Sequence, residues 1–178
     1  MHEKLRHAII LRSWNILFSM TTFRIRFINS GKSFVGRGID WVTDSLMDHT
    51  EIIMDSGDYL GARSSGGVMV RNPDYCKVTW ERRYAIPCTD QQLANIMAFA
   101  ISKIGVKYNF SDITGLLFKD RHINNPNGMI CSQFVLESAQ AGPLEMLNVL
   151  PGFDYLITPE TLHLSSLLIG NCYYRYVS

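Results

Sequence analysis

Alternation of apolar and polar residues predicts the first strand of the chain. Residues 22–28 read TFRIRFI, in which apolar and polar side chains alternate. A period of two residues is typical of a strand with one buried face, and the NSGK sequence that follows is a turn signal. The next stretch, residues 33–43, mixes glycines with apolar residues and fits either a strand or a short helix.

Further strands are predicted downstream, with glycine-containing turns between them. The DSGD sequence at residues 55–58 and the SSGG sequence at residues 64–67 are the turn signals. The predicted strands cover residues 49–54, 59–63 and 68–71, with one or two more between residues 78 and 86. We therefore predict that residues 50–87 form a β-meander.

Residues 90–104 show the clearest helical pattern in the chain. Apolar side chains recur there at spacings of three and four residues, at Leu93, Ile96, Met97, Ala100, Ile101 and Ile104. Thr89 and Gln92 have the spacing of a capping box, and Gly105 marks the end of the helix. We interpret this helix as a packing element of the core.

Shorter elements are predicted in the second half of the chain. Residues 106–127 are rich in loop-forming residues around a short apolar element at residues 113–118. Thr158 is placed to cap a helix that begins with Pro159, and residues 173–177 fit a last strand. Together these elements predict one α+β domain, in which an antiparallel sheet packs against helices.

The first 20 residues are interpreted separately from this domain. Their apolar stretches are interrupted by Arg12, Ser13 and Asn15, and no small-residue cleavage site follows them. They are too short and too broken to span a bilayer, so we expect no transmembrane segment and no signal peptide, while an amphipathic helix stays open. We assign residues 1–20 as an N-terminal extension and residues 21–178 as the single domain, with Met20 as an alternative start.

Composition narrows the class of protein. Of the 178 residues, 47% are hydrophobic and 11% aromatic, which is enough for one domain with its own core. A net charge of +1 gives no electrostatic case for binding nucleic acid. The four cysteines and five histidines show no CxxC pair and no metal-finger spacing. We therefore expect reduced thiols, no metal site and no cofactor, in a cytoplasmic or virion-associated protein.

Cys131 is the candidate nucleophile. The sequence NGMICSQFV at residues 127–135 predicts a loop that enters a helix at Cys131, and Gly142 with Pro143 ends that helix. Unpaired backbone N–H groups and the positive end of the helix dipole favour a thiolate at this place, as a cysteine nucleophile requires. The alternative is a buried cysteine that packs as a small apolar side chain.

His49 is the candidate base, because it begins a predicted strand whose end can face a cleft. The other histidines are interpreted as solvated or incidental: His2, His7, His122 and His163. Glu51 lies two residues further along the same strand face, where it can accept a hydrogen bond from the imidazole N–H. The alternative for Glu51 is an exposed strand carboxylate.

Five short stretches follow one another in a recognisable order. They are a His-x-Glu strand start at His49, YLGAR at residues 59–63, GGV at 66–68, GVKY at 105–108 and GMICSQF at 128–134. This order resembles the circularly permuted branch of the NlpC-type papain-like cysteine hydrolases. In the ordinary branch the cysteine helix precedes the histidine strand, whereas here His49 precedes Cys131. The resemblance covers residues 23–164 and implies a circularly permuted papain-like fold.

The same resemblance implies roles for single residues. Cys131 is the nucleophile and His49 the base, while Tyr108 lines the pocket and helps to hold the oxyanion beside the backbone N–H of Cys131. In relatives, the strand after the histidine strand carries a polar residue that orients the histidine. This chain has Arg63 at that place, and an arginine side chain has no acceptor for an imidazole N–H. The orienting group is then Glu51, Ser64 or a backbone carbonyl, and Ser64 is also a candidate substrate-binding residue.

The resemblance implies acyl transfer from an amide in a peptidoglycan stem peptide or a similar short peptide. Relatives of lecithin–retinol acyltransferase belong to the same branch, so a lipid acyltransferase or thioesterase is a second expectation, which the apolar residues 1–20 would suit. A catalytically silent binding or virion-associated module is a third expectation. The lack of a hydrogen-bond acceptor at Arg63 favours it. The expected partner is a peptide or peptidoglycan fragment, or a lipid acyl substrate.

Overall fold

The structure is a computed structural model that describes residues 21–30, 47–111, 127–144, 146, 157–165 and 172–173, the last two by their backbone only. Three predicted features lie outside these residues: the segment of residues 1–20 with its alternative start, the unassigned stretch at 33–43 and the apolar element at 113–118. Of the predicted last strand, only residue 173 is described.

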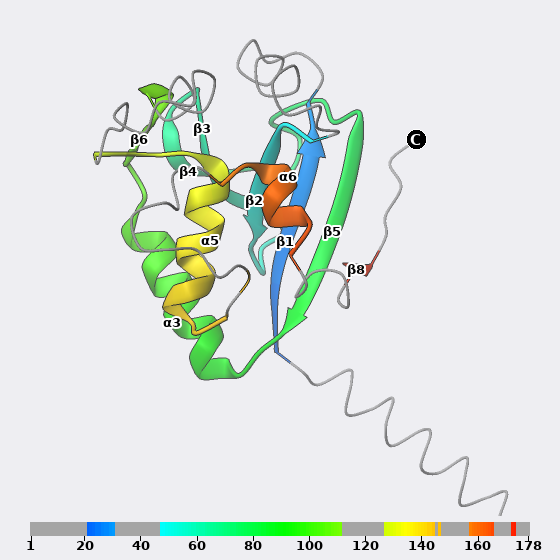
Figure 1. Cartoon of the computed structure of the whole chain (residues 1–178), viewed down its shortest axis with the longest axis vertical. Helices are drawn as coiled ribbons and strands as arrows, with labels where there is room; N and C mark the ends of the chain where they lie inside the picture. The colour runs from blue at the N-terminus through cyan, green and yellow to red at the C-terminus, as the bar shows by residue number, and fades with distance from the viewer. Residues whose placement is uncertain are drawn as a thin grey trace, which may run out of the picture.

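Within the described residues, six strands form one antiparallel sheet in the order β4-β3-β2-β1-β5-β8 (Figure 1). The strands are β1 (Thr22–Asn29), β2 (His49–Ile53), β3 (Tyr59–Arg63), β4 (Gly67–Arg71), β5 (Trp80–Pro87) and β8 (Cys172–Tyr173). Each strand is antiparallel to its neighbours in this sheet. The prediction of an α+β protein with an antiparallel sheet is thus confirmed.

The predicted β-meander is only partly right. β2, β3 and β4 follow one another across the sheet, but β5 pairs with β1 on the other side of β2. β1 and β5 match along their whole length, from Thr22 opposite Pro87 to Asn29 opposite Trp80. Alternation along a sequence shows where strands lie, but it does not show which strands become neighbours. The connection at residues 72–79 therefore passes from the β4 edge across three strands to reach β5.

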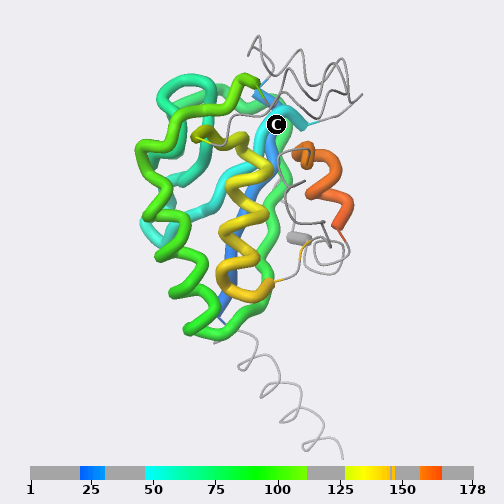
Figure 2. Tube along the Cα trace, turned by 60° about the vertical axis from the view of Figure 1, so that its left-hand side comes forward, coloured from blue at the N-terminus to red at the C-terminus, as the bar shows by residue number. Residues whose placement is uncertain are grey.

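Three helices with described bounds accompany the sheet: α3 (Asp90–Ser102), α5 (Cys131–Ala141) and α6 (Pro159–His163). α3 and α5 run side by side along the sheet in both views (Figures 1 and 2). A short parallel pair, β6 (Lys107–Tyr108) and β7 (Gly128–Met129), brings the chain to the start of α5.

The predicted helix caps are confirmed. Thr89 Oγ1 accepts the N–H of Gln92 at 3.2 Å, and the N–H of Thr89 donates to Gln92 Oε1 at 2.9 Å. Thr158 caps α6 in the same position relative to its helix. α3 ends at Ser102, earlier than predicted, and Gly105 then takes a φ of +93°, which does not continue a helix.

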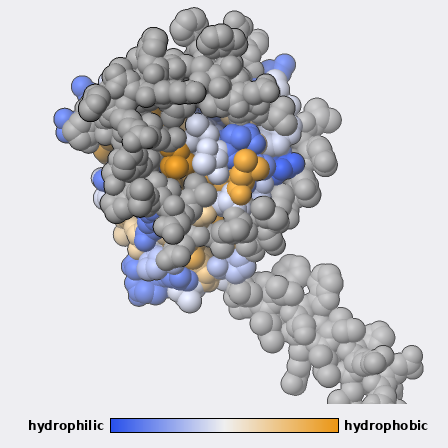
Figure 3. Space-filling model, viewed as in Figure 1, coloured by the Kyte–Doolittle hydropathy of each residue, from blue (hydrophilic) through white to orange (hydrophobic). Residues whose placement is uncertain are grey.

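The core lies between the sheet and the helices. Its fully buried side chains include Phe23, Ile25, Phe27, Ile52 and Leu60 from the strands and Ile96, Phe134, Val135 and Ala139 from the helices. Burying each large apolar side chain contributes about 1.5–3 kcal/mol to folding. Hydrophilic residues gather over the first turn of α3, where Asp90 and Gln91 are exposed (Figure 3). No described helix is long and apolar enough to cross a membrane.

Candidate active site

Cys131 is the first residue of α5, as predicted. Ile130 before it is extended, with φ −92° and ψ 165°, and offers no capping side chain. The N–H groups of the first turn therefore donate to no capping side chain of Ile130, and the thiol lies at the positive end of the helix dipole. Cys131 is a free cysteine and is 2% exposed.

His49 begins β2 and contacts both Cys131 and Glu51. Its imidazole is close enough to the Cys131 side chain for this side chain to raise its pKa, and its Nε2 atom lies 3.1 Å from Oε1 of Glu51. This contact has the distance of an ion pair, but its geometry is not that of a hydrogen bond. Because Nε2 faces Glu51, Nδ1 is the ring nitrogen left to face Cys131. The structure thus brings together the three predicted catalytic residues.

Glu51 is fully buried, so its interpretation as an exposed strand carboxylate is wrong. Arg26 donates to Oε2 from Nε at 2.9 Å and from Nη2 at 2.7 Å. The Tyr75 hydroxyl donates to Oε1 at 2.7 Å. Gly61 of β3 lies beside this side chain, and a Cβ atom there would be 2.9 Å from Cγ of Glu51. The glycine therefore leaves the space that the glutamate occupies.

Charge pairing sets the protonation states of His49 and Glu51. Burial alone would lower the His49 pKa, but the Glu51 carboxylate and the contact with Cys131 outweigh burial, and the pKa is raised above its ordinary value. Burial alone would raise the Glu51 pKa, but His49 and Arg26 outweigh it and hold this pKa well below its usual range. The folded protein therefore favours an imidazolium beside a carboxylate.

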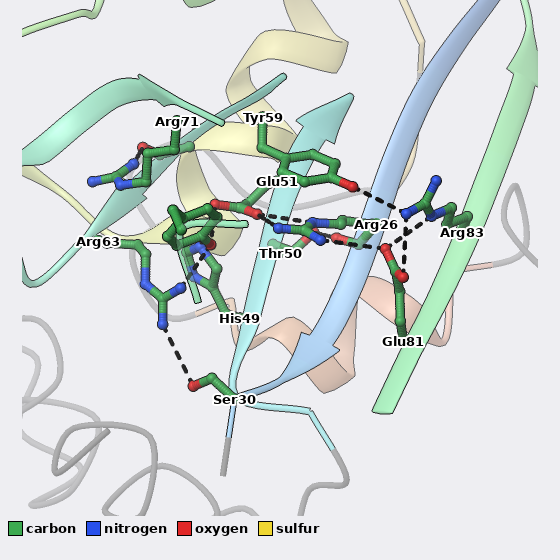
Figure 4. Close-up of polar contacts among 12 residues, drawn as sticks. Arg26, Ser30, His49, Thr50, Glu51, Tyr59, Arg63, Arg71, Glu81 and Arg83 are labelled. Atoms are coloured by element: carbon green, nitrogen blue, oxygen red, sulfur yellow. Dashed lines mark hydrogen bonds and ion pairs between the residues drawn. The ribbon is translucent and has the colours of Figure 1, made fainter. Parts of the chain in front are cut away.

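Arg26 extends this pair into a buried network (Figure 4). Its Cζ atom lies 3.2 Å from the centre of the Tyr59 ring, and its Nη1 atom lies 3.4 Å from Oε1 of Glu81. Arg83 donates to the same Glu81 oxygen at 2.8 Å and to the Tyr59 hydroxyl at 3.0 Å. Arg26 is only 2% exposed. A buried charge that lacks partners costs several kcal/mol, so these groups depend on one another.

The sequence interpretation missed Arg26 and Tyr75. The alternation of residues 22–28 places Arg26 on the polar face of a strand, which a half-buried strand turns to solvent. Instead, the register sets Arg26 directly opposite Glu51 of β2. Tyr75 lies in the connection at residues 72–79, where no periodic pattern marks it. The sequence places Arg26 and Glu51 on two predicted strands, and this was the available signal. Only the register of the two strands shows that the residues meet.

Tyr75 links Glu51 to Arg63, the residue that stands where the family resemblance expects an orienting group. Arg63 Nη1 donates to the Tyr75 hydroxyl at 2.6 Å, and the hydroxyl donates in turn to Glu51. Burial and the nearby Glu51 carboxylate raise the pKa of Tyr75, so the phenol keeps its proton. Arg63 therefore acts on Glu51 through Tyr75.

Ser64, a predicted substrate-binding residue and a candidate for the orienting role, lies directly after β3. It is exposed and lines a cavity of about 300 Å³. Glu51, rather than Ser64, occupies the place beside Nε2 of His49. Of the alternatives open from the sequence, Glu51 is thus the one whose contacts fit the orienting role.

Tyr108, the other predicted substrate-binding residue, borders the chain that enters α5. It pairs with Met129 in the parallel β6–β7 pair, just before Cys131. Its ring packs edge-on against the Phe110 ring, with 5.2 Å between the centroids. Its contribution to an oxyanion site stays a prediction.

His163 has a structural environment. Its Nε2 atom lies 3.0 Å from Nη1 of Arg82, and its ring packs against the rings of Phe27, Trp80 and Tyr84. Burial and the charge of Arg82 lower its pKa, so the ring favours the neutral form. This agrees with its interpretation as incidental to the site. His2, His7 and His122 lie outside the described residues.

Among the described residues, no group of three His, Cys, Asp or Glu side chains is placed to hold a metal ion. No protein-family model matches the chain, and neither does any curated protein. Cys131, His49 and Glu51 place a thiol, an imidazole and a carboxylate in series, which allows a proton to leave the thiol and return to a leaving group.

Proposed function

We propose that the protein is a cysteine hydrolase in which Cys131 is the nucleophile, His49 the general base and acid, and Glu51 the residue that orients His49. One observation carries this proposal. His49 contacts the Cys131 side chain and, at 3.1 Å through Nε2, the buried Glu51 carboxylate. An activated cysteine needs a base within hydrogen-bond reach and a third group that holds the base in place.

The reaction begins from the thiolate of Cys131 and the imidazolium of His49, the pair that exists once His49 holds the thiol proton. Sγ then attacks the amide carbonyl carbon, so that an S–C bond forms and the π electrons of the carbonyl move to its oxygen. The N–H groups in the first turn of α5 are donors for this oxyanion. The C–N bond then breaks, and His49 gives its proton to the leaving nitrogen. Water attacks the thioester with His49 as base, the S–C bond breaks, and the thiol is restored.

The order of the elements supports a circularly permuted papain-like fold as part of this proposal. β2, which begins with His49, precedes α5, which begins with Cys131, and α5 packs against β2 and β3. A permuted chain keeps the spatial neighbours of the family while it changes their order in sequence. The nucleophile and the base meet in either order.

The proposed substrate is an amide in a short peptide, such as a peptidoglycan stem peptide, on the basis of the family resemblance. A lipid acyltransferase keeps the same nucleophile and base and differs in its acyl donor and acceptor. A catalytically silent module is the second candidate, because Cys131 and His49 are only 2% and 4% exposed.

Alkylation of the full chain by iodoacetamide at neutral pH, followed by mapping of the adducts, tests the proposal. We expect Cys131 to react about tenfold faster than Cys76 and Cys88, despite its burial, because it has an imidazole partner. His49→Ala should abolish this advantage. Arg24→Gln, which removes an exposed ion pair at the far end of β1, should preserve it. Equal rates at Cys76, Cys88 and Cys131 of the wild type contradict the proposed function.

A further inference from the structure

A cavity of about 300 Å³ lies beside the start of β2. Its lining is largely polar and includes Ser30, Arg63, Ser64, Tyr75 and Lys77. Ser30 directly follows β1 and Arg63 is the last residue of β3, and both strands are antiparallel neighbours of β2. The cavity is therefore at the end of the sheet where His49 begins β2, and Figure 4 shows Arg63 and Ser30 close to His49.

Two cationic side chains of this cavity have no carboxylate partner among the described residues. Arg63 donates to the Tyr75 hydroxyl at 2.6 Å and to Ser30 Oγ at 3.4 Å. Lys77 is exposed at the cavity. Within the described part of the chain, no Asp or Glu lies at ion-pair distance from either one. Arg63 therefore interacts with two hydroxyl groups and with the Cys76 side chain, and no carboxylate of the described residues pairs with it.

The surrounding charges leave this region positive. Arg71 donates its hydrogen bonds to backbone carbonyl groups, namely those of Gly61, Ser65, Gly67 and Met69. Glu51 is already paired with Arg26 and with the histidine. Asp48 accepts hydrogen bonds from the N–H and the hydroxyl of Ser30. An anionic group that enters the cavity would therefore meet cations that have no counter-ion among the described residues.

The proposed reaction brings one part of the substrate to the His49 end of the sheet, where this cavity lies. His49 gives its proton to the leaving nitrogen, so the leaving group lies on the His49 side of the scissile bond. We propose that the cavity binds a carboxylate of the leaving group through Arg63 and Lys77, so that the protein releases an amino acid or a short peptide. A guanidinium offers paired N–H donors to a carboxylate, and the Ser64 hydroxyl adds another. This inference rests on the proposed function and adds the chemical class of the leaving group.

Two alkylating reagents that differ only in charge test the site in the full chain. N-iodoacetylglycine ends in a carboxylate, and N-iodoacetylglycinamide ends in a carboxamide. With either reagent, Sγ of Cys131 attacks the CH₂ carbon, the S–C bond forms, and iodide leaves with the electrons of the C–I bond. The measured quantity is the rate constant for the anionic reagent divided by that for the neutral one. The same ratio for N-acetylcysteinamide, a small free thiol, is the reference.

We expect the ratio at Cys131 to exceed the reference by about tenfold, because a charge-assisted hydrogen bond from Arg63 favours the anionic reagent. Arg63→Gln should remove most of this preference. Lys77→Gln should lower it about twofold, since an exposed charge contributes less. Arg24→Gln removes the same charge at the far end of β1 and should leave the ratio unchanged.

Three outcomes overturn the inference in different ways. A wild-type ratio equal to the reference, with Cys131 still the fast thiol toward the neutral reagent, removes the carboxylate site and leaves the proposed function intact. A ratio that falls with His49→Ala but not with Arg63→Gln or Lys77→Gln assigns the preference to the imidazolium alone. Slow reaction of Cys131 with both reagents removes the proposed function and this inference together. If circular dichroism shows that Arg63→Gln unfolds, the ratio for Lys77→Gln decides.

Discussion

Arg26 binds a single oxygen of Glu51 with two nitrogens, at 2.9 Å from Nε and 2.7 Å from Nη2. The other oxygen is thereby left for His49 at 3.1 Å and for the Tyr75 hydroxyl at 2.7 Å. The carboxylate cannot rotate without losing its contact with Arg26 or with His49. Glu51 therefore serves both the orientation of His49 and the neutralisation of Arg26, and a substitution of Glu51 changes stability as well as chemistry.

The contribution of the Glu51–His49 pair to stability should be largest within a limited pH range. The His49 pKa is raised in the folded protein, so its contribution is complete below about pH 6.5 and is lost as the pH rises through the folded value. The Glu51 pKa is lowered, so its contribution is complete above about pH 4.5 and is lost as the pH falls through the folded value. Between these limits, Glu51→Gln should lower the free energy of unfolding most, by about 3 kcal/mol, because Arg26 is left buried and poorly paired.

Urea denaturation at a series of pH values measures this difference. Asp55→Asn is the matched control, because the Asp55 side chain is 94% exposed and pairs with Arg24 at the surface. A difference between wild type and Glu51→Gln that stays constant from about pH 3 to pH 9 would contradict the charged pair.

Tyr75→Phe should weaken the site without abolishing it. The variant keeps the ring but removes the hydroxyl that donates to Glu51 and accepts from Arg63. We expect the free energy of unfolding to fall by about 1–2 kcal/mol, and alkylation of Cys131 to slow a few-fold, because Arg26 still holds the carboxylate. Thermal denaturation and iodoacetamide kinetics measure the two effects. Alkylation as slow as that of His49→Ala would show that Tyr75 has a larger role than positioning Glu51.

Gly61→Ala should disturb Glu51 directly. The added Cβ atom would lie 2.9 Å from Cγ of Glu51, whose carboxylate is held and cannot move aside freely. We expect a loss of about 1–3 kcal/mol and slower alkylation of Cys131. Gly57→Ala is the control, since it strains a turn with φ of +89° but meets no atom within 4 Å, so it should cost stability alone. If Cys131 of Gly61→Ala is alkylated at the wild-type rate, this result would argue against the orienting role of Glu51.

Thr89→Ala should separate stability from chemistry. It removes one half of the capping box at the start of α3, for a loss of about 1 kcal/mol. The alkylation rate of Cys131 should not change, because no described contact joins Thr89 to the site. An unchanged melting temperature together with a much lower alkylation rate of Cys131 is the opposite result and would contradict this separation.

Signals that act over a few residues were sufficient to predict much of this fold. The capping box of Thr89 and Gln92 and the start of a helix at Cys131 depend on neighbours within one helical turn, and both are confirmed. The position of β5 beside β1 was not predictable, because pairing depends on register between distant segments. For the same reason the alternation in β1 gave no sign that Arg26 is buried.

The candidate site divides in the same way. His49 and Glu51 lie two residues apart on one strand, so their meeting follows from strand geometry. Arg26 reaches Glu51 from the neighbouring strand, and Tyr75 reaches it from a connection with no regular structure. Such contacts come from the tertiary fold, and no spacing within the sequence marks them.

The passage of residues 72–79 across the sheet has a consequence for the kinetics of folding. β2, β3 and β4 are joined by short turns and can pair early, whereas β1 pairs with β5 only after the intervening chain has closed a loop of about 50 residues or more. Non-local pairing of this kind slows folding, because loop-closure entropy is lost before contacts compensate it. We therefore expect the closure of β1 on β5 to limit the folding rate. Arg26 of β1 then meets Glu81 of β5 at that step, so the buried network around Glu51 is complete only after β5 has closed on β1.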